Sequence, residues 1–266
     1  MGADIKSLRT RIKSVKSTLQ LTKAMGLVAS SKIRKAQINR VKAKEYENAV
    51  SSIINVLTAS RECEKSVYMT PLSDKEKLIV ISGDRGMAGG YNANIVRFAR
   101  DNANGDFLPI GKKACERYGK EFKSSEHFSY SDALELAREL CSDFTEGNYG
   151  KISILYTEYI SMMSQTPVIK QILPLEKGES KASSGAIFEP NELTVLDSAV
   201  PTYIAGIIFS AIKESFACEV ISRRNAMDSA GKNASAMIDE LMLKYNRARQ
   251  GSITQEITEI VAGSNS

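Results

Sequence analysis

Residues 5–29 read IKSLRTRIKSVKSTLQLTKAMGLVA, and residues 227–248, near the other end of the chain, read MDSAGKNASAMIDELMLKYNRA. In both stretches apolar or small residues recur at intervals of three and four positions, which is the a/d spacing of a coiled-coil seam. The members of the two seams are Ile5, Leu8, Ile12, Val15 and Leu19 in the first, and Ala234, Ile238, Leu241, Tyr245 and Ala248 in the second. Neither helix can bury its stripe alone, so the two are predicted to bury each other.

The antiparallel arrangement pairs the seams in one register. Position 5 meets 248, 8 meets 245, 12 meets 241, 15 meets 238 and 19 meets 234, so that the numbers of every pair add up to 253. Large residues then face small ones, as in Leu19 against Ala234, which favours knobs-into-holes packing. In the alternative arrangement, each helix packs separately on a globular core.

Long helices are also favoured by the distribution of proline. All six prolines lie between Pro71 and Pro201 of the 266-residue chain, and proline is the residue that breaks helices most strongly. The sequence therefore predicts an α/β protein with a long antiparallel coiled coil and a small, mostly parallel sheet inserted between its two helices. We expect an N-terminal helix over 1–58, an α/β domain over 70–200 and a C-terminal helix over 203–262.

The central part of the chain alternates strand and helix signals, which is typical of a parallel sheet covered by helices. Strands are predicted at Lys77–Ser82, Phe107–Ile110, Lys151–Tyr156 and Val168–Leu175. Helices are predicted at Asn92–Arg100, Lys112–Lys120 and Ser131–Phe144, the last with Ser131 or Asp132 as its N-cap. The polar segment Gly178–Gly185 is predicted to be a loop.

The predicted register leaves the C-terminal end of the second helix without a partner in the chain. This end still carries an apolar face formed by Ile253, Ile257, Ile260 and Val261. Such a face suggests a socket formed by another protein, and the alternative is a frayed terminus.

The charge of the chain is uneven. Residues 1–45 hold 12 Lys and Arg against 2 acids, whereas the whole chain has a net charge of only +5. A basic helix can bind nucleic acid, but this one lacks interleaved aromatic residues and fits equally well against acidic loops of a protein. No uninterrupted apolar run is long enough to span a bilayer, so direct membrane insertion is not expected.

The residues that could carry chemistry do not form a convincing site. The four cysteines lie far apart without a C-x-x-C pair, and His127 is the only histidine, so neither a metal site nor a His-based catalytic site is predicted. The glycine-rich segment Gly83–Asn92 follows a strand and precedes a helix, as a phosphate-binding loop does, but it matches neither standard phosphate-loop pattern. A tight turn that presents a surface loop is the alternative. No catalytic, cofactor-binding or metal-binding residue is expected.

Several motifs nevertheless resemble one family, the gamma subunits of rotary F-type ATP synthases of the bacterial type. The N-terminal motif consists of Thr22–Met25 and Leu27–Gln37, the glycine-rich turn is Asp84–Asn92, and the C-terminal motif consists of Ile238–Leu241 and Lys244–Gly263. The order and the positions of these motifs match the family. Gly231 and Gly251 stand where the family favours residues with higher helix propensity.

The resemblance implies a non-catalytic rotor, or central stalk, that couples proton flow through a membrane sector to ATP synthesis or hydrolysis. The implied partners are the alpha and beta subunits of the catalytic ring, an epsilon-type small stalk subunit and the membrane ring of c subunits. The implied location is peripheral, on the cytoplasmic face of the bacterial cell membrane. The residues carried over as coupling contacts with the catalytic subunits are Lys23, Met25, Arg249, Gln250, Thr254 and Glu256. The alternatives are a basic coiled-coil scaffold or nucleic-acid-binding protein, and a small α/β enzyme with helical arms.

Overall fold

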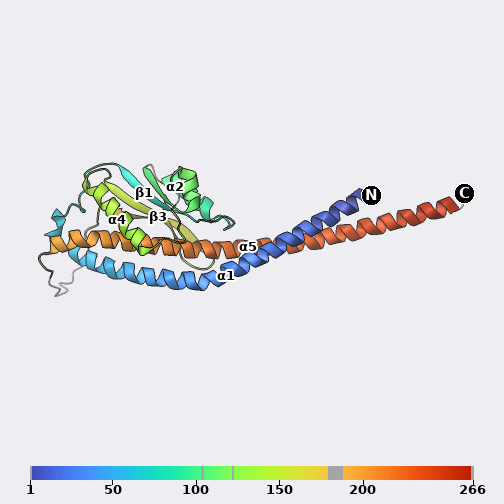
Figure 1. The fold of residues 1–266 in the computed structure, drawn as a ribbon, viewed down its shortest axis with the longest axis horizontal. Helices are drawn as coiled ribbons and strands as arrows, with labels where there is room; N and C mark the ends of the chain where they lie inside the picture. The colour runs from blue at the N-terminus through green and yellow to red at the C-terminus, as the bar shows by residue number, and fades with distance from the viewer. Residues whose placement is uncertain (1, 103–104, 122, 179–187, 265–266) are drawn as a thin grey trace. The chain divides into compact units, whose positions relative to one another are not determined.

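The computed structural model describes residues 2–102, 105–121, 123–178 and 188–264. Two helices, α1 (Gly2–Thr58) and α5 (Glu192–Ser264), begin and end the chain (Figure 1). The contacts divide the chain into two compact units, residues 1–30 with 223–266, here called the coil unit, and residues 31–222, here called the α/β unit. Each unit is described by itself below. The predicted combination of two long helices with an inserted α/β sheet is confirmed.

The α/β unit contains a four-stranded sheet with the order β2-β1-β3-β4. Its strands are β1 (Glu76–Ile81), β2 (Asp106–Ile110), β3 (Lys151–Tyr159) and β4 (Gln165–Leu173). β1 is parallel to both β2 and β3, and Ile79 pairs with Leu108 on one side and with Ile154 on the other. β4 runs antiparallel to β3, because the two strands are joined by the short turn Ile160–Ser164. The sheet is therefore mostly parallel, as predicted, with one antiparallel edge.

Two apolar clusters cover the two faces of this sheet. The larger cluster joins alternate residues of β1 and β3, such as Ile79 and Ile154, to α4 (Tyr130–Thr145), the first half of α5 and the end of α1. The smaller cluster joins Leu78 and Val80 of β1 to α2 (Tyr91–Asn102) and to α3 (Lys112–Tyr118). The side chains of β1 alternate between the two clusters, as the period of a strand requires.

The domain boundaries expected from the sequence differ from the compact units. The last part of α1 and the first part of α5 belong to the α/β unit, because Leu57, Leu196 and Val200 are buried in its larger apolar cluster. The predicted start of the C-terminal helix at residue 203 is wrong, since α5 begins at Glu192 and contains Pro201. Val200 and Ile204, on either side of Pro201, are both buried, and this packing keeps the helix continuous where proline would normally break it.

α5 also contains a segment that is long and apolar enough to cross a membrane by length and composition. This segment is not an uninterrupted apolar run in the sequence, because isolated polar residues such as Asp197 and Ser210 interrupt it. More than half of that segment is buried inside the protein. This burial is what the central helix of a folded core requires, and α5 supplies Ile204, Ile208 and Ile212 to the larger apolar cluster.

α4 begins one residue before the predicted helix, and its N-cap is neither of the two candidates. The side chain of Ser129 accepts a hydrogen bond from the N–H of Asp132, and the carboxylate of Asp132 accepts one from the N–H of Ser129. This reciprocal pair is a capping box, in which Asp132 occupies the N3 position. The predicted loop Gly178–Gly185 lies, from residue 179 onward, outside the described residues.

A close backbone approach at the carboxyl ends of β1 and β2 depends on Gly111. This glycine has a φ of 94°, and a Cβ atom built on it would lie 2.1 Å from the carbonyl oxygen of Ser82. Its N–H donates a hydrogen bond of 2.7 Å to the carbonyl of Lys123, so the position cannot move without losing that bond. Only a residue without a side chain fits here.

Replacing Gly111 with alanine should therefore destabilise the protein by about 3 kcal/mol or more, through the clash and the strained φ together. Gly119 provides the matched control, because its φ is also positive, at 65°, but no atom lies within 4 Å of a Cβ placed there. Gly119→Ala should cost about 1 kcal/mol, from backbone strain alone. Urea unfolding of both variants measures the difference, and equal losses would contradict the role of the close approach.

Candidate coupling surface

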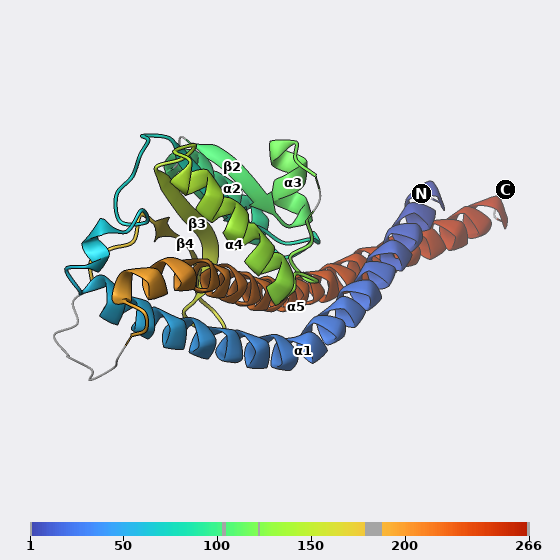
Figure 2. The same cartoon turned by 60° about the vertical axis from the view of Figure 1, so that its left-hand side comes forward.

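The coil unit brings the two predicted seams side by side (Figures 1 and 2). Ala234, Ile238 and Leu241 are buried. The other predicted seam residues are half-buried, namely Ile5, Leu8, Ile12, Val15, Leu19, Tyr245 and Ala248. Every one of the ten is thus at least partly withdrawn from water.

Two direct contacts report the register. A Cβ atom built on Gly26 would lie 3.6 Å from the Cβ of Met227, and one built on Gly231 would lie 3.8 Å from the Oγ1 of Thr22. The residue numbers of each pair add up to 253, the sum that the seam spacing predicts for the pairs nearer the N-terminus. Both glycines face the partner helix at ordinary van der Waals distance, so they let the two backbones approach closely.

A groove of about 520 Å³ lies beside these glycines. Its walls carry the cations Lys23, Arg224 and Lys232 together with the apolar side chains of Leu19 and Leu27. Asp228 lies on the same wall and pairs with Lys232 through a 2.8 Å contact between Nζ and Oδ2. The groove therefore combines apolar side chains with a net positive charge, which suits an acidic segment with an apolar side chain.

The structure does not bring the six expected coupling residues together. Lys23 is exposed at the groove and Met25 is half-buried beside it, whereas Arg249, Gln250, Thr254 and Glu256 are all exposed further along α5. In the register above, Lys23 lies level with residue 230, and Arg249 lies about 28 Å further along the helix axis. The expected contacts thus form two separate levels on the coil unit.

The four apolar residues that are expected to fit a socket, here called the tip, are exposed. The exposed fractions are 45% for Ile253, 56% for Ile257, 70% for Ile260 and 53% for Val261. All four lie on the part of α5 that continues past the N-terminus of α1 (Figure 1). The described segment is helical up to Ser264, and its side chains Thr254 and Thr258 donate hydrogen bonds to carbonyls of the preceding turn.

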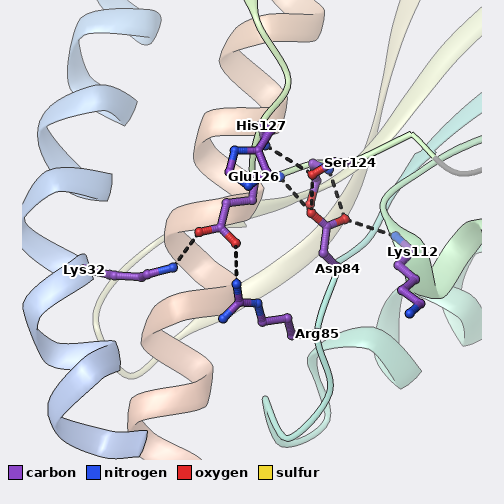
Figure 3. A network of polar contacts seen from close by, with 8 residues as sticks. Lys32, Asp84, Arg85, Lys112, Ser124, Glu126 and His127 are labelled. Carbon is purple, nitrogen blue, oxygen red and sulfur yellow. Dashed lines mark hydrogen bonds and ion pairs between the residues drawn. The ribbon is translucent and has the colours of Figure 1, made fainter.

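The carboxylate of Asp84, which belongs to the glycine-rich turn, accepts hydrogen bonds from neighbouring segments of the α/β unit (Figure 3). Asp84 accepts hydrogen bonds from the backbone N–H groups of Lys112, Ser125 and Glu126 at 3.0–3.1 Å and from the hydroxyl of Ser124 at 2.6 Å. Burial raises the pKa of Asp84, but the Ser124 hydroxyl and the three N–H groups outweigh it and hold the pKa below its usual value.

Asp84 thus holds the start of α3 and the loop at residues 124–126 against the glycine-rich turn. The glycine-rich segment forms a tight surface turn, in which the side chain of Asn92 accepts a bond from the N–H of Gly83. His127 is exposed, and its backbone N–H donates to the hydroxyl of Ser124. The four cysteines are all buried and unpaired, and the described residues contain no group of three side chains that could hold a metal ion.

Sequence reasoning missed a set of ion pairs that join α1 to the rest of the α/β unit. The carboxylate of Glu126 lies 2.5 Å from Nζ of Lys32 and 3.4 Å from a guanidinium nitrogen of Arg85 (Figure 3). Glu47 is buried in α1 and receives Lys170 of β4 at 2.6 Å. In the sequence, the signal for these pairs was the acidic residue Glu47 on an otherwise basic helix. Its partner Lys170 lies 123 residues away, so no local pattern indicates the pairing.

Comparison with known proteins identifies the family to which this chain belongs. The family model described as ATP synthase matches residues 4–266. The ATP synthase gamma chain of Ruminococcus albus is 39% identical and covers 98% of both chains, and that of Geotalea uraniireducens is 37% identical and covers 99% of both. The chain belongs to the ATP synthase gamma chain family.

Solved structures show the same fold at lower identity. A chain from the mitochondrial ATP synthase of Euglena gracilis, solved with its F1 part and c-ring, has a TM-score of 0.70, covers all of this chain, is itself covered over 95% and is 17% identical. A chain from the central stalk and c-ring of the Tetrahymena thermophila enzyme has a TM-score of 0.63 and 22% identity over 79% of this chain and 99% of its own length.

The register predicts which cysteine pairs can close. We propose that the sum of 253 holds up to the end of the seam, so that Ile5→Cys with Ala248→Cys forms a disulfide under mild oxidation, at Cα distances within about 4.4–6.8 Å. Ile5→Cys with Leu241→Cys is the matched control and should stay reduced, because the two positions are about two turns apart. Non-reducing electrophoresis distinguishes the pairs, and closure of the second without the first would overturn the register.

Proposed function

We propose that the chain is the non-catalytic rotor, or central-stalk, subunit of a proton-translocating ATP synthase. The observation that carries this proposal is the match to ATP synthase gamma chains over almost the full length of the chain and of its relatives. Membership of this family also argues against a nucleic-acid-binding scaffold.

The proposed partners follow from membership of the family. The coil unit would stand inside the ring of alpha and beta subunits, with coupling contacts at Lys23, Met25, Arg249, Gln250, Thr254 and Glu256. The chain would also contact the ring of c subunits and an epsilon-type small stalk subunit, on the cytoplasmic face of a bacterial membrane. It would hold no cofactor or metal.

The mechanism relies on the difference between the two levels of contact. The positive groove at Lys23 offers charges and apolar side chains that differ around the shaft, so rotation presents each catalytic subunit with a different surface. The tip offers an apolar face, and apolar contact is non-directional and changes little with angle. Torque would therefore act at the groove and at the level of Arg249, while the tip would centre the shaft.

Reconstitution tests the proposal. The purified chain should not hydrolyse ATP, and vesicles that carry the remaining subunits without it should show no ATP-driven proton uptake. Adding the chain should restore uptake, measured with a pH-sensitive dye. ATP turnover by the pure chain that is abolished by Arg85→Ala, or uptake without the chain, would contradict a rotor role.

The tip makes a separate prediction. Deleting residues 260–266 should lower the assembled fraction or the thermal stability of the complex more than its ATP turnover per assembled complex. Ile257→Asp should be worse than the deletion, because it places a charge in an apolar collar. Thr258→Asp is the matched control, since it adds the same charge off the apolar face. Normal assembly with collapsed turnover in the deletion would show that the tip carries torque.

A further inference from the structure

The part of α1 that lies in the α/β unit is held in two different ways along its length. Near its C-terminal end, Ile54 and Leu57 are buried in the larger apolar cluster. Between residues 31 and 47, the buried apolar side chains are only those of Ala36 and Ala43, one heptad apart. Alanine offers a single methyl group, so this stretch of helix rests on a smooth and shallow surface.

Charged contacts supplement that surface at three positions, 32, 40 and 47, which we call the ionic row. Lys32 binds Glu126 in the loop between α3 and α4 at 2.5 Å. Arg40 lies 3.9 Å from Glu214 of α5 and 4.5 Å from the ring centre of Tyr159 in β3. The third position is Glu47, which pairs with Lys170 of β4. The spacings of 8 and 7 residues keep all three on one face of α1.

The three carboxylates in these ion pairs are withdrawn from water, which makes the pairs stronger than ordinary surface ion pairs. Glu47 and Glu214 are buried, and Glu126 is half-buried. Burial raises the pKa of Glu47, but hydrogen bonding and attraction to Lys170 outweigh it and lower the pKa below its usual value. A charge in such a place needs its partner, because an unpaired buried charge is strongly unfavourable.

The two kinds of contact respond differently to sliding. A shift of α1 by one heptad would bring Ala43 to the place of Ala36, so the two alanine methyl groups resist such a shift only weakly, whereas Ile54 and Leu57 resist it near the end of the helix. The same shift would move each member of the ionic row by about 10 Å and separate every pair. Rotation about the helix axis would break the pairs in the same way. Between residues 31 and 47, the axial and rotational position of α1 is therefore set by these charged contacts together with Tyr46, whose hydroxyl lies 2.9 Å from that of Tyr130 and whose ring meets the Tyr130 ring edge-on.

We propose that the ionic row is the positioning device that passes torque between α1 and the sheet of the α/β unit, an inference that rests on the proposed rotor function. Lys32, Arg40 and Glu47 act through Glu126, Glu214 and Lys170, and none of them touches a nucleotide. Without the row, residues 31–47 of α1 keep only shallow apolar contacts and yield under load, although Ile54 and Leu57 stay anchored, and part of the rotation is lost before it reaches the sheet.

The first test measures backbone hydrogen exchange in the full chain. The variant Lys32→Gln/Arg40→Gln/Lys170→Gln should exchange about tenfold faster over residues 31–47, while residues 54–57 stay close to the wild-type rate. The control Arg34→Gln/Lys35→Gln/Lys42→Gln removes the same charge from exposed positions of α1 and should exchange like the wild type. Equal exchange in the two variants would overturn the proposal.

Single variants keep the test valid if the triple variant folds poorly. Lys32→Gln should speed exchange around residue 32, and Lys32→Arg should restore it, because arginine also pairs with Glu126. Raising the salt concentration should speed exchange there in the wild type more than in Lys32→Gln, since part of the pair is open to solvent. Failure of Lys32→Arg to restore the rate would count against an ionic contact.

The second test uses the complete complex in vesicles. Protons pumped per ATP hydrolysed should fall about twofold or more in Lys32→Gln, with hydrolysis per complex retained, and Lys32→Arg should recover the wild-type ratio. Faster exchange with an unchanged ratio would mean that the row bears no torque, and would overturn the proposal. If the wild-type complex itself does not pump protons, the proposed rotor function and the torque role both fail. The exchange data would still show whether the ionic row holds residues 31–47 of α1 in place.

Discussion

The apolar seam between the two ends of the chain is the contact on which the other features depend. Each helix of the coil unit buries one stripe, and only the other helix is available to cover it. Gly26 and Gly231 face Met227 and Thr22 across this contact and fix the register in which residue numbers add up to 253. From the register follow the groove at Lys23 and the uncovered apolar tip, and therefore the surfaces through which a shaft can act on a surrounding ring.

The α/β unit places the same two helices in unequal roles. α5 is a core helix there, with Leu196, Ile204 and Ile212 buried against the sheet. α1 is anchored in the apolar cluster near Ile54 and Leu57, but between residues 31 and 47 it is held by two alanines, the Tyr46–Tyr130 contact and the ionic row. A helix held by a broad apolar core resists displacement in every direction, whereas a helix held by discrete pairs has its position set by those pairs. Of the two helices, α1 is thus the one whose attachment can be tuned by single substitutions.

Much of this could be predicted from the sequence, because the seam and the strands follow local periodicities. The four strands and the helices of the sheet were found to within a few residues for that reason. The features that were missed depend on contacts between distant residues. Proline normally ends a helix, but Pro201 does not, because Val200 and Ile204 are buried on either side of it. The pairing of Glu47 with Lys170 has no local signature. The expected coupling residues came from resemblance, and the register places them at two separate levels on the coil unit.

Rotation of the chain inside its complex is the most direct test of the account. The four native cysteines are buried, so Ser131→Cys on the exposed side of α4 offers a selective site for attaching a bead or a gold particle. With the catalytic ring fixed to a surface, ATP should drive the particle in one direction in discrete steps that stop when ATP is removed. Steady ATP hydrolysis by labelled complexes whose particles do not turn would contradict the claim that this chain is the rotor.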